Sequence, residues 1–427
     1  MGEGVLTSGF SRVEGTLTCD GVPLDRIAAD VGTPTYVYSA ATVRDRFERL
    51  DGALAGVPHR VHYTLKANSN AAILRVLREL GAGADVVSGG ELFRARRAGF
   101  EGDDIIFGGV GKTERELREA LQAGVMLINV ESGDEVRLLD RLAGELGVIA
   151  PIGLRANPEV SVDSSHRYIK TGERGAKFGI PFDDVYSVAH LASSLPNVRL
   201  IGLDMHIGSQ IFRLDPYMDG VDRLAGLLGE LRESGVDTIR FLDIGGGLGV
   251  AYDDEQVPDL QRFAAALLPR VRATGLTLLM EPGRFIVGNA GVLLTRVLYR
   301  KHSGGRDFLI TDAGMTELIR PSHYDAYHRI EPVRQPVGRM TADVVGPVCE
   351  SGDFLALNRE MPQANAGDLL AVFDVGAYGY VMASNYNTRP RGAEVLVDAD
   401  RYAVVSARER YDDLVRLEQV DPEWREG

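Results

Sequence analysis

Short apolar runs rich in β-branched residues alternate with amphipathic segments from about Tyr36 to Gly288. This alternation is typical of parallel strands that are joined by helices. The predicted strands are residues 59–68, 84–88, 104–108, 125–130, 151–157, 201–209, 241–247 and 277–283. The first two thirds of the chain therefore read as repeated βα units of one domain.

The segments between these strands have the spacing of helices that bury one face. In residues 70–83 the apolar side chains recur at helical spacing, and Gly81 supplies a stop. Residues 112–124 and 216–235 repeat leucine in the same way. Eight βα units in roughly 250 residues fit one closed (β/α)8 barrel of the TIM type. A doubly wound open sheet is the alternative, although it usually has fewer strands.

The pattern changes after Gly288. Strand-like runs separated by Gly, Asp and Asn turns follow with little helix between them, although Pro321 is suited to open a short helix. Residues 1–34 contain no barrel unit of their own. We therefore predict an α/β barrel over residues 35–289 and a C-terminal antiparallel β domain, sandwich-like or barrel-like, over residues 290–427, which takes in residues 1–34.

Composition narrows the class of protein. The chain has 427 residues and a net charge of −14, which disfavours a nucleic-acid or anionic-membrane partner. Cys19 and Cys349 are the only cysteines, so the sequence has neither a disulfide framework nor the spacing of a zinc site. No signal peptide and no apolar stretch near the roughly 20 residues of a membrane span are evident. We expect a cytoplasmic protein.

Unusual polar and glycine-rich residues follow the predicted strands. They are Lys66, Ser88-Gly89-Gly90-Glu91, Glu131, His206, Ser209, Gly245-Gly246-Gly247 and Glu281-Pro282-Gly283-Arg284. In a barrel the carboxyl ends of all strands form one rim, where active sites are built. The sequence therefore predicts that residues as far apart as Lys66 and Arg284 meet in one pocket.

The chemistry of these residues points to one cofactor. Lys66 can form a Schiff base with a carbonyl compound, and three consecutive glycines let backbone N–H groups approach a phosphate. Buried Glu281 needs a cationic partner such as a protonated ring nitrogen, and His206 is flat enough to stack on that ring. The purely structural alternatives are that Lys66 is a solvated lysine, that the glycines form a tight turn, and that His206 is a histidine of the core. Together the four features fit pyridoxal 5'-phosphate.

Motifs along most of the chain carry a resemblance to a known family. The motifs are YTLKAN, ADVVSGGEL, YIKTGERGAKFGI, MHIGSQI, LDIGGGLG, EPGRFIV, IRPSHYDAYH, GPVCESGD and GAYGYVMASNYNTRP, with GVPLDRIAADVGTPTYVYS near the N-terminus. In this order, from about residue 20 to residue 410, the sequence resembles the diaminopimelate decarboxylases, which are barrel-type (fold type III) pyridoxal-phosphate enzymes. Several of the motifs are shared with ornithine and arginine decarboxylases.

The resemblance implies a set of cofactor contacts. Lys66 would carry the cofactor, His206 would stack on its ring and Glu281 would pair with the ring nitrogen. Tyr378 would reach the phosphate from the β domain. The remaining implied cofactor-binding residues are Asp85, Ser209, Gly245, Gly246, Gly247, Pro282, Gly283 and Arg284.

The resemblance also implies how substrate is held. Arg284, Arg320, Tyr324 and Tyr378 would bind the substrate. Glu350, with the proton donor Cys349, would enter from a second subunit. The expected assembly is thus a homodimer with shared active sites.

The expected reaction is decarboxylation of meso-2,6-diaminopimelate at its D-centre, giving L-lysine and CO2 in lysine biosynthesis. The alternatives are decarboxylation of another basic amino acid, of a carboxylated polyamine precursor or of a modified diaminopimelate. An alanine-racemase-like enzyme and a non-catalytic pyridoxal-phosphate carrier also stay open. A metal-dependent hydrolase using His62, Asp204, His206 and Asp243 has no supporting spacing, and we expect no metal.

Overall fold

The protein is described by a computed structural model over residues 9–160, 175, 177–257 and 259–425. The motif at residues 168–180 therefore lies largely outside the described residues. The chain forms two compact units. One unit, termed the barrel unit, comprises Ala40–Ala290 with Gly376–Val381, and the rest of the chain forms the β unit.

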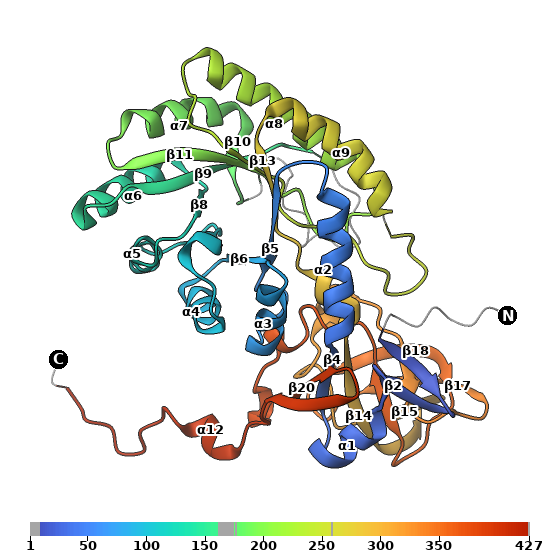
Figure 1. The fold of residues 1–427 in the computed structure, drawn as a ribbon. Coiled ribbons are helices and arrows are strands. Elements are labelled where there is room, and N and C mark those ends of the chain that lie inside the picture. The colour runs from blue at the N-terminus through green and yellow to red at the C-terminus, as the bar shows by residue number, and fades with distance from the viewer. Residues whose placement is uncertain (1–8, 161–174, 176, 258, 426–427) are drawn as a thin grey trace. The chain divides into compact units, whose positions relative to one another are not determined.

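All eight predicted barrel strands are present, and all of them pair in parallel (Figure 1). They are β5 (His59–Thr64), β6 (Gly83–Val86), β7 (Ile105–Phe107), β8 (Leu127–Val130), β9 (Ala150–Asn157), β11 (Val198–Asp204), β12 (Phe241–Asp243) and β13 (Thr277–Met280). The pairing of β8 with β9 and of β13 with β5 closes the ring. The prediction of a closed barrel is confirmed, and the open sheet is excluded.

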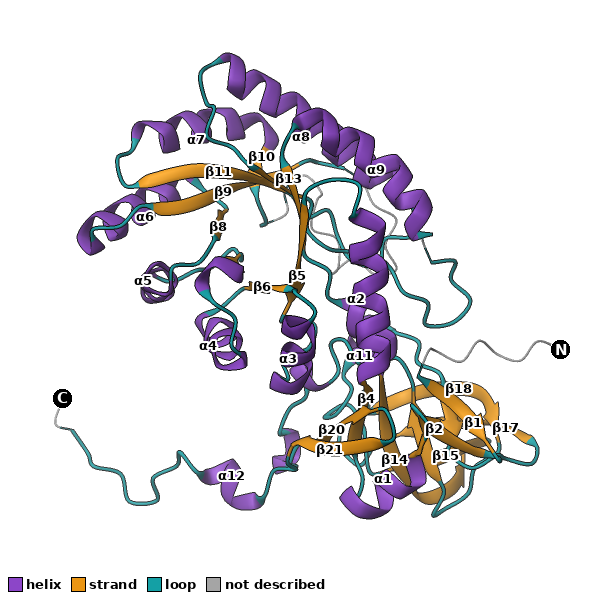
Figure 2. Ribbon diagram, viewed as in Figure 1, coloured by secondary structure: helices purple, strands orange, loops and turns teal. Residues whose placement is uncertain are grey.

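Except for α2, which precedes β5, the helices of the barrel unit each follow a strand of the parallel sheet; Figure 2 draws them in purple and the strands in orange. They are α2 (Ala40–Leu54), α3 (Ala71–Glu79), α4 (Gly89–Ala98), α5 (Glu114–Ala123), α6 (Gly133–Leu146), α7 (Phe182–Ser194), α8 (Asp215–Glu233), α9 (Leu260–Thr274) and the short α10 (Arg284–Val287). A two-residue strand, β10 (Ile180–Pro181), extends the sheet beside β9.

Local sequence explains where these helices begin and end. Thr113 and Glu116 form a reciprocal capping box at the start of α5, and Gly124 ends the helix in the left-handed conformation. Leu117 and Leu121 then fall on the buried face. Ser88 and Ser132 cap α4 and α6 in a similar way, which places the start of each helix directly after its strand.

The barrel interior is apolar at its centre. Ile106, Leu127, Ile201 and Leu279 from four strands pack into one cluster with no more than 3% exposure. Strands that are buried on both faces read as continuous apolar runs, which is why the sequence pattern located them. Titratable residues inside this ring therefore stand out.

His62 is one such residue, and it yields a stability prediction. It is fully buried on β5, neither ring nitrogen has a hydrogen-bond partner among the described residues, and burial together with Arg60 lowers its pKa to about 3. An unfolded chain binds a proton here below about pH 6.5, whereas the folded chain does not, so His62 lowers stability as the pH falls. Between pH 8 and pH 5 this loss is about 2 kcal/mol.

We expect His62→Leu to remove that part of the acid sensitivity. Urea unfolding of the cofactor-free protein, followed by circular dichroism at pH 8 and pH 5, measures it. His302→Leu, at an exposed position of the β unit, is the control. Equal acid sensitivity in wild type and His62→Leu would contradict the assignment.

The β unit contains most of the remaining strands. They are β1 (Phe10–Val13), β2 (Thr16–Cys19), β3 (Val22–Pro23), β4 (Thr35–Ser39), β14 (Gly291–Ser303), β15 (Arg306–Thr311), β16 (Ile330–Pro332), β17 (Arg339–Val345), β18 (Phe354–Pro362), β19 (Leu369–Val372), β20 (Ala393–Asp398) and β21 (Arg401–Ser406). The main sheet runs β18-β17-β15-β14-β4-β20-β21, and β19 joins β16 to β14. The short helices are α1 (Leu24–Val31), α11 (Arg320–Tyr324) and α12 (Tyr411–Val415).

The N-terminal segment is part of this β unit. Phe10, Leu17 and Leu24 are buried with Val292 and Phe373 in one apolar core. The sheet differs from the prediction in being mixed: β15 pairs with β17, and β4 with β20, in parallel. Chain direction within a sheet is set by long-range connections, which a strand's own sequence does not encode.

The boundaries of the two units differ from residues 35 and 289 in two places. Residues 35–39 form β4, which pairs with β14 and β20 of the β unit. Residues 376–381 return to the barrel unit, where the Gly376 N–H donates to Gly288 O. The first exception arises because TYVYS is buried throughout and precedes a helix, so it resembles a barrel strand.

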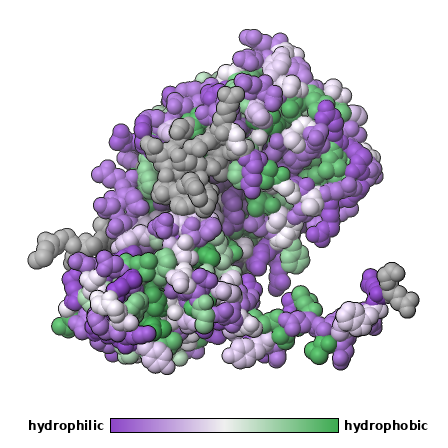
Figure 3. All heavy atoms as spheres, turned by 180° about the vertical axis from the view of Figure 1, so that it is seen from behind, coloured by the Kyte–Doolittle hydropathy of each residue, from purple (hydrophilic) through white to green (hydrophobic). Residues whose placement is uncertain are grey.

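No helix in the described part of the chain is long and apolar enough to cross a membrane. Hydrophilic residues cover most of the face drawn in Figure 3. This is expected for helices whose apolar stripe packs against a sheet.

Candidate active site

Lys66 lies in the turn that follows β5. The Tyr63 hydroxyl donates to Asn68 O over 2.8 Å, and Asn68 Nδ2 donates to Gly376 O over 3.0 Å, so the turn is fixed from both sides. Lys66 Nζ lies 3.2 Å from Asp85 Oδ2 at the end of neighbouring β6. The turn thus holds a lysine amino group beside a carboxylate that is 1% exposed.

The charge of Lys66 is set by its neighbours. Burial acts to lower the pKa of Lys66, but Asp85, together with Tyr378 and Glu281, outweighs it and raises the pKa above its usual range. Lys66 is therefore an ammonium in the cofactor-free protein. Since only a neutral amine is a nucleophile, Asp85 Oδ2 is the nearest acceptor for the proton that Lys66 must lose.

A cavity of about 400 Å³ opens beside this amino group. It is lined by Lys66, Asp85, Val87, Gly108, Gly109, Val110, Gly111, Asn129, Arg155, Phe178, Asp204, His206 and Glu281. Apart from Phe178, which precedes β10, these lining residues come from strand ends of the barrel or from the segments that directly follow them. The cavity thus joins a lysine, the rings of Phe178 and His206, and several carboxylates at one end of the barrel.

Buried charges form one wall of the cavity. Arg155 on β9 bonds Glu131 Oε1 at 2.8 Å and lies 3.9 Å from Asp204 Oδ2. Glu281, just after β13, is 9% exposed, and burial with the nearby Asp243 and Asp85 raises its pKa well above the usual range. Burial also raises the pKa of Asp204. More carboxyl groups than cations share this wall, so the site favours a cationic ligand group.

His206, which follows β11, lies in the same cavity. The Gly246 N–H donates to His206 Nδ1 over 3.2 Å, which makes Nδ1 the acceptor nitrogen. Burial, together with Arg155 and Lys66, lowers the pKa of His206 well below its usual value. The ring is therefore neutral and can stack on an aromatic ligand.

The glycine turn after β12 is built for close backbone contacts. A Cβ atom at Gly246 would lie 2.2 Å from Glu281 O, and one at Gly247 would lie 2.4 Å from Gly208 O. Gly247 also has φ +107°, which side chains other than glycine rarely adopt. The buried Tyr217 hydroxyl on α8 donates to Gly246 O over 2.6 Å. Only glycines fit this turn, which packs against the segment that carries Glu281.

Arg284, the first residue of α10, bonds two hydroxyl groups. It is 7% exposed, donates to Ser209 Oγ over 3.3 Å and to Tyr252 Oη over 2.7 Å, and stacks on the Tyr378 ring with 4.8 Å to the centroid. Tyr378 is tied in turn to the Lys66 turn, since its N–H donates to Ala67 O over 2.8 Å. Contrary to the prediction, Tyr378 belongs to the barrel unit rather than to the β unit.

The structure thus brings together most of the cofactor-binding residues that the sequence analysis proposed. Pro282 and Gly283 complete the set: Pro282 O accepts the Thr64 N–H over 3.3 Å, and a Cβ at Gly283 would lie 2.5 Å from Thr64 Cγ2. These contacts hold the end of β13 against the Lys66 turn.

The other four proposed residues belong to the β unit. Arg320 opens α11, is 6% exposed and bonds His328 Nε2 over 2.9 Å, while His328 Nδ1 donates to Phe373 O over 2.8 Å. Tyr324 ends α11 and is half-buried. Within the β unit, α11 therefore fixes a buried guanidinium.

Cys349 and Glu350 are exposed and lie between β17 and β18. The Cys349 N–H donates to Asn387 Oδ1 over 3.2 Å, and the Glu350 N–H donates to Val348 O over 2.8 Å. The segment is therefore held by backbone bonds within the β unit while both side chains stay accessible.

Sequence reasoning missed several residues of the cavity. Arg155 was not named, and Asp204 was named only as a metal ligand; each is a charged position inside an otherwise apolar strand, a pattern that has many structural explanations. Lys112 was not singled out either. Its Nζ is fully buried, donates to Asn129 O over 2.8 Å and pairs with Glu135 at 2.8 Å. It anchors the glycine segment 108–111 that lines the cavity.

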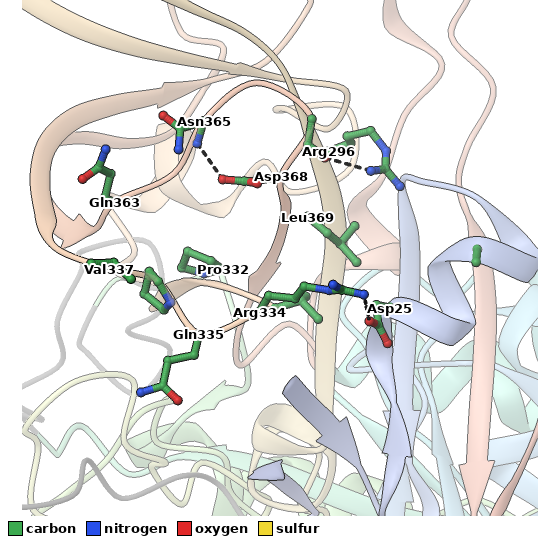
Figure 4. A pocket seen from close by; sticks show the side chains of 14 residues that line it. Asp25, Arg296, Pro332, Arg334, Gln335, Val337, Gln363, Asn365, Asp368 and Leu369 are labelled. Atoms are coloured by element: carbon green, nitrogen blue, oxygen red, sulfur yellow. Dashed lines mark hydrogen bonds and ion pairs between the residues drawn. The ribbon is translucent and has the colours of Figure 1, made fainter. Parts of the chain in front are cut away.

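A second hollow, of about 590 Å³, lies in the β unit (Figure 4). Its polar groups already have partners: Arg334 pairs with Asp25 at 3.1 Å, Arg296 donates to Gly367 O, and the Asn365 N–H donates to Asp368. The hollow contains neither a buried titratable side chain nor a nucleophile among its lining residues. We therefore place the candidate active site in the barrel cavity.

Among the described residues, no group of three or more His, Cys, Asp or Glu side chains is arranged to hold a metal ion. The four residues of the metal-site alternative therefore do not form such a group.

Comparisons with known proteins agree with this geometry. The family described as "Pyridoxal-dependent decarboxylase, pyridoxal binding domain" matches residues 40–288. A diaminopimelate decarboxylase of Pseudomonas aeruginosa is 49% identical over 415 residues, which cover 97% of this chain and 99% of the relative.

Two solved structures extend the comparison to the whole fold. A diaminopimelate decarboxylase from Helicobacter pylori complexed with L-lysine is 38% identical, has a TM-score of 0.89 and covers 92% of this chain and 99% of its own. A diaminopimelate decarboxylase from M. jannaschii in complex with L-lysine is 34% identical, has a TM-score of 0.92 and covers 97% and 99%. The likeness therefore spans both compact units and not the barrel alone.

Proposed function

The chain belongs to the diaminopimelate decarboxylase family of pyridoxal-dependent decarboxylases, and on this premise we propose that it converts meso-2,6-diaminopimelate to L-lysine and CO2. The observation that carries the proposal is the barrel cavity, where Lys66 and Glu281 share one wall with neutral His206. Relatives crystallised with L-lysine support the choice of product. The enzyme would act in amino-acid biosynthesis in the cytoplasm.

The residues present fit pyridoxal 5'-phosphate. Glu281 lines the cavity, and its buried Oε1 receives no N–H or hydroxyl from the described residues. A protonated ring nitrogen would supply the missing donor. The glycine turn has no side chain that would keep phosphate oxygens away from its backbone, and a Cβ at Gly246 or Gly247 would collide with backbone. When bound, the cofactor supplies an electron sink for the electron pair that CO2 leaves at the α-carbon.

The barrel residues divide the work of binding and orientation. Lys66 Nζ would hold the cofactor covalently, with Asp85 Oδ2 receiving its proton. Glu281 would keep the ring nitrogen protonated, and His206 would stack on the ring and keep water from that face. The phosphate would be bound by Ser209, Gly245, Gly246, Gly247, Gly283, Arg284 and Tyr378, with Pro282 fixing the turn.

The β unit supplies groups for the substrate. Diaminopimelate carries a second amino-acid group at its far end, and buried Arg320, held by His328, suits a carboxylate there through forked hydrogen bonds. Tyr324 would help to place the far ammonium. Arg284 and Tyr378 would add contacts from the barrel unit.

A second subunit would complete the site. We propose a homodimer in which Glu350 of one chain binds the far ammonium of substrate held by the other. Cys349 Sγ would return a proton to the α-carbon after CO2 has left. The exposure of both side chains, together with the backbone bonds that hold their segment, supports this assignment.

A turnover assay tests the proposed reaction. With added pyridoxal phosphate, we expect CO2 release and L-lysine from meso-diaminopimelate, at least about 100-fold faster than release from ornithine, arginine or lysine. The reason is that those substrates leave the buried guanidinium of Arg320 without its anion, which costs several kcal/mol in a desolvated site. A preference for another amino acid, or turnover without CO2, would overturn the proposal.

A further inference from the structure

Asp243 is a buried carboxyl group for which the reaction above has no use. It ends β12, is 0% exposed and does not line the cavity. Its Oδ1 accepts the Gly245 N–H over 2.9 Å, and its Oδ2 lies 3.4 Å from Asn129 Nδ2. Only the bond from Gly245 is short. One short hydrogen bond offsets little of the free energy that it costs to bury a carboxylate.

The remaining neighbour of Asp243 is Glu281: in the register of β12 and β13 Asp243 lies opposite Leu279, two positions before Glu281, and the two carboxyl groups are close enough for a side-chain hydrogen bond. Two carboxyl groups bond in this way only when one of them carries a proton. Glu281 Oε1 is buried and receives no N–H or hydroxyl from the described residues, so no other donor replaces that proton. The Glu281 N–H also donates to Gly245 O over 2.9 Å, which closes a ring of contacts through the glycine turn.

The surrounding charges favour retention of one proton. Asp204 on β11 and Asp85 on β6 face the pair with negative charge, while Lys66 and Arg155 face Glu281 with positive charge. Burial and the mutual repulsion of the two acids raise the pKa of both Asp243 and Glu281. Two negative charges at this contact would have no cation between them.

We propose that Asp243 is a positioning residue that shares one proton with Glu281 and so holds the Glu281 carboxyl group as a single negative charge facing the cofactor ring nitrogen. Asp243 touches neither cofactor nor substrate and acts through Glu281 and the glycine turn. The inference rests on the proposed role of Glu281.

Infrared difference spectroscopy of the cofactor-free protein at pH 7 tests the shared proton. We expect the wild-type minus Asp243→Asn spectrum to contain the C=O band of a protonated carboxyl group, because an amide donates to Glu281 without an extra proton. Bands of other buried acids are present in both proteins and cancel. Asp237→Asn, at an exposed position of the same unit, should give no such difference.

Cofactor affinity separates positioning from simple packing. Asp243→Asn should keep its affinity for pyridoxal phosphate within about 3-fold, since the amide can still accept from Gly245 and donate to Glu281, and Asn129 Oδ1 has no partner and can accept its second N–H. Asp243→Leu, which has no donor, should lose affinity by at least about 30-fold. Circular dichroism verifies that the variants fold.

Two results would overturn the proposal. One is a difference spectrum without a protonated-carboxyl band, which would make Asp243 an ionised acceptor only. The other is an equal loss of affinity in Asp243→Asn and Asp243→Leu. Failure of the proposed function would appear in a different measurement, the activity of Glu281→Gln. Full activity of that variant would exclude the proposed role of Glu281, whereas the infrared result would be unchanged.

Discussion

Lys66→Ala is expected to lose at least about 1000-fold in turnover of meso-diaminopimelate, even with excess pyridoxal phosphate. Among the described residues Lys66 is the only lysine that lines the barrel cavity, and Asp85 Oδ2 lies 3.2 Å from its nitrogen, ready to accept its proton. Without that amine the cofactor has no covalent link to the protein. Steady-state CO2 release measures the effect.

The control for this prediction is Lys301→Ala, at an exposed position of β14, which should leave turnover unchanged. Added methylamine should restore part of the Lys66→Ala activity, because a free amine can enter the space that the side chain vacates. Near-normal turnover by Lys66→Ala would exclude Lys66 as the cofactor-binding residue.

The second large effect is expected for Glu281→Gln, with a loss of about 100- to 1000-fold in turnover. A glutamine amide cannot provide the negative charge that keeps a ring nitrogen protonated, so the electron sink is weakened. Glu281 is 9% exposed, and hence water cannot replace its charge. Rates at saturating cofactor isolate this effect from weaker cofactor binding.

Glu233→Gln, at an exposed site at the end of α8, is the matched control and should retain full activity. The absorption spectrum of the Glu281→Gln holoenzyme should shift, since the ring nitrogen loses its proton. A variant with wild-type rate and spectrum would show that another residue faces the ring nitrogen.

The sequence was most informative about the barrel. All eight strand segments were located because strands buried on both faces form apolar runs, and each run was followed by a helix with one apolar face. The same pattern located the site, since polar residues such as Lys66 and Glu281 interrupt those runs at strand ends. The predicted strands at 201–209 and 241–247 ran beyond Asp204 and Asp243, because the glycine turns that end them are also apolar.

Long-range placement was the part that sequence patterns did not provide. The strand at Thr35–Ser39 pairs with residues more than 250 positions away, and nothing in its own sequence indicates that partner. Tyr378 was assigned to the β domain because β strands flank it in the chain, yet its N–H bonds Ala67 O in the barrel unit. The unit to which such a segment belongs depends on contacts between residues that are far apart in the sequence.

The roles of charged residues within the barrel strands were also hard to recognise. Arg155, Asp204 and Asp243 each lie within or at the end of an apolar strand, where a single charged residue has many structural explanations. Their importance appears only when the strands close and their charges lie near Glu281. The roles of Cys349 and Glu350 in a second subunit remain predictions.

The most direct measurement is mass spectrometry of the yellow holoenzyme after reduction with borohydride and proteolysis. The account predicts that a pyridoxyl group is found on the peptide that contains Lys66, and specifically on its side-chain nitrogen. An unmodified Lys66 peptide, or a label on another lysine such as Lys112, would contradict it.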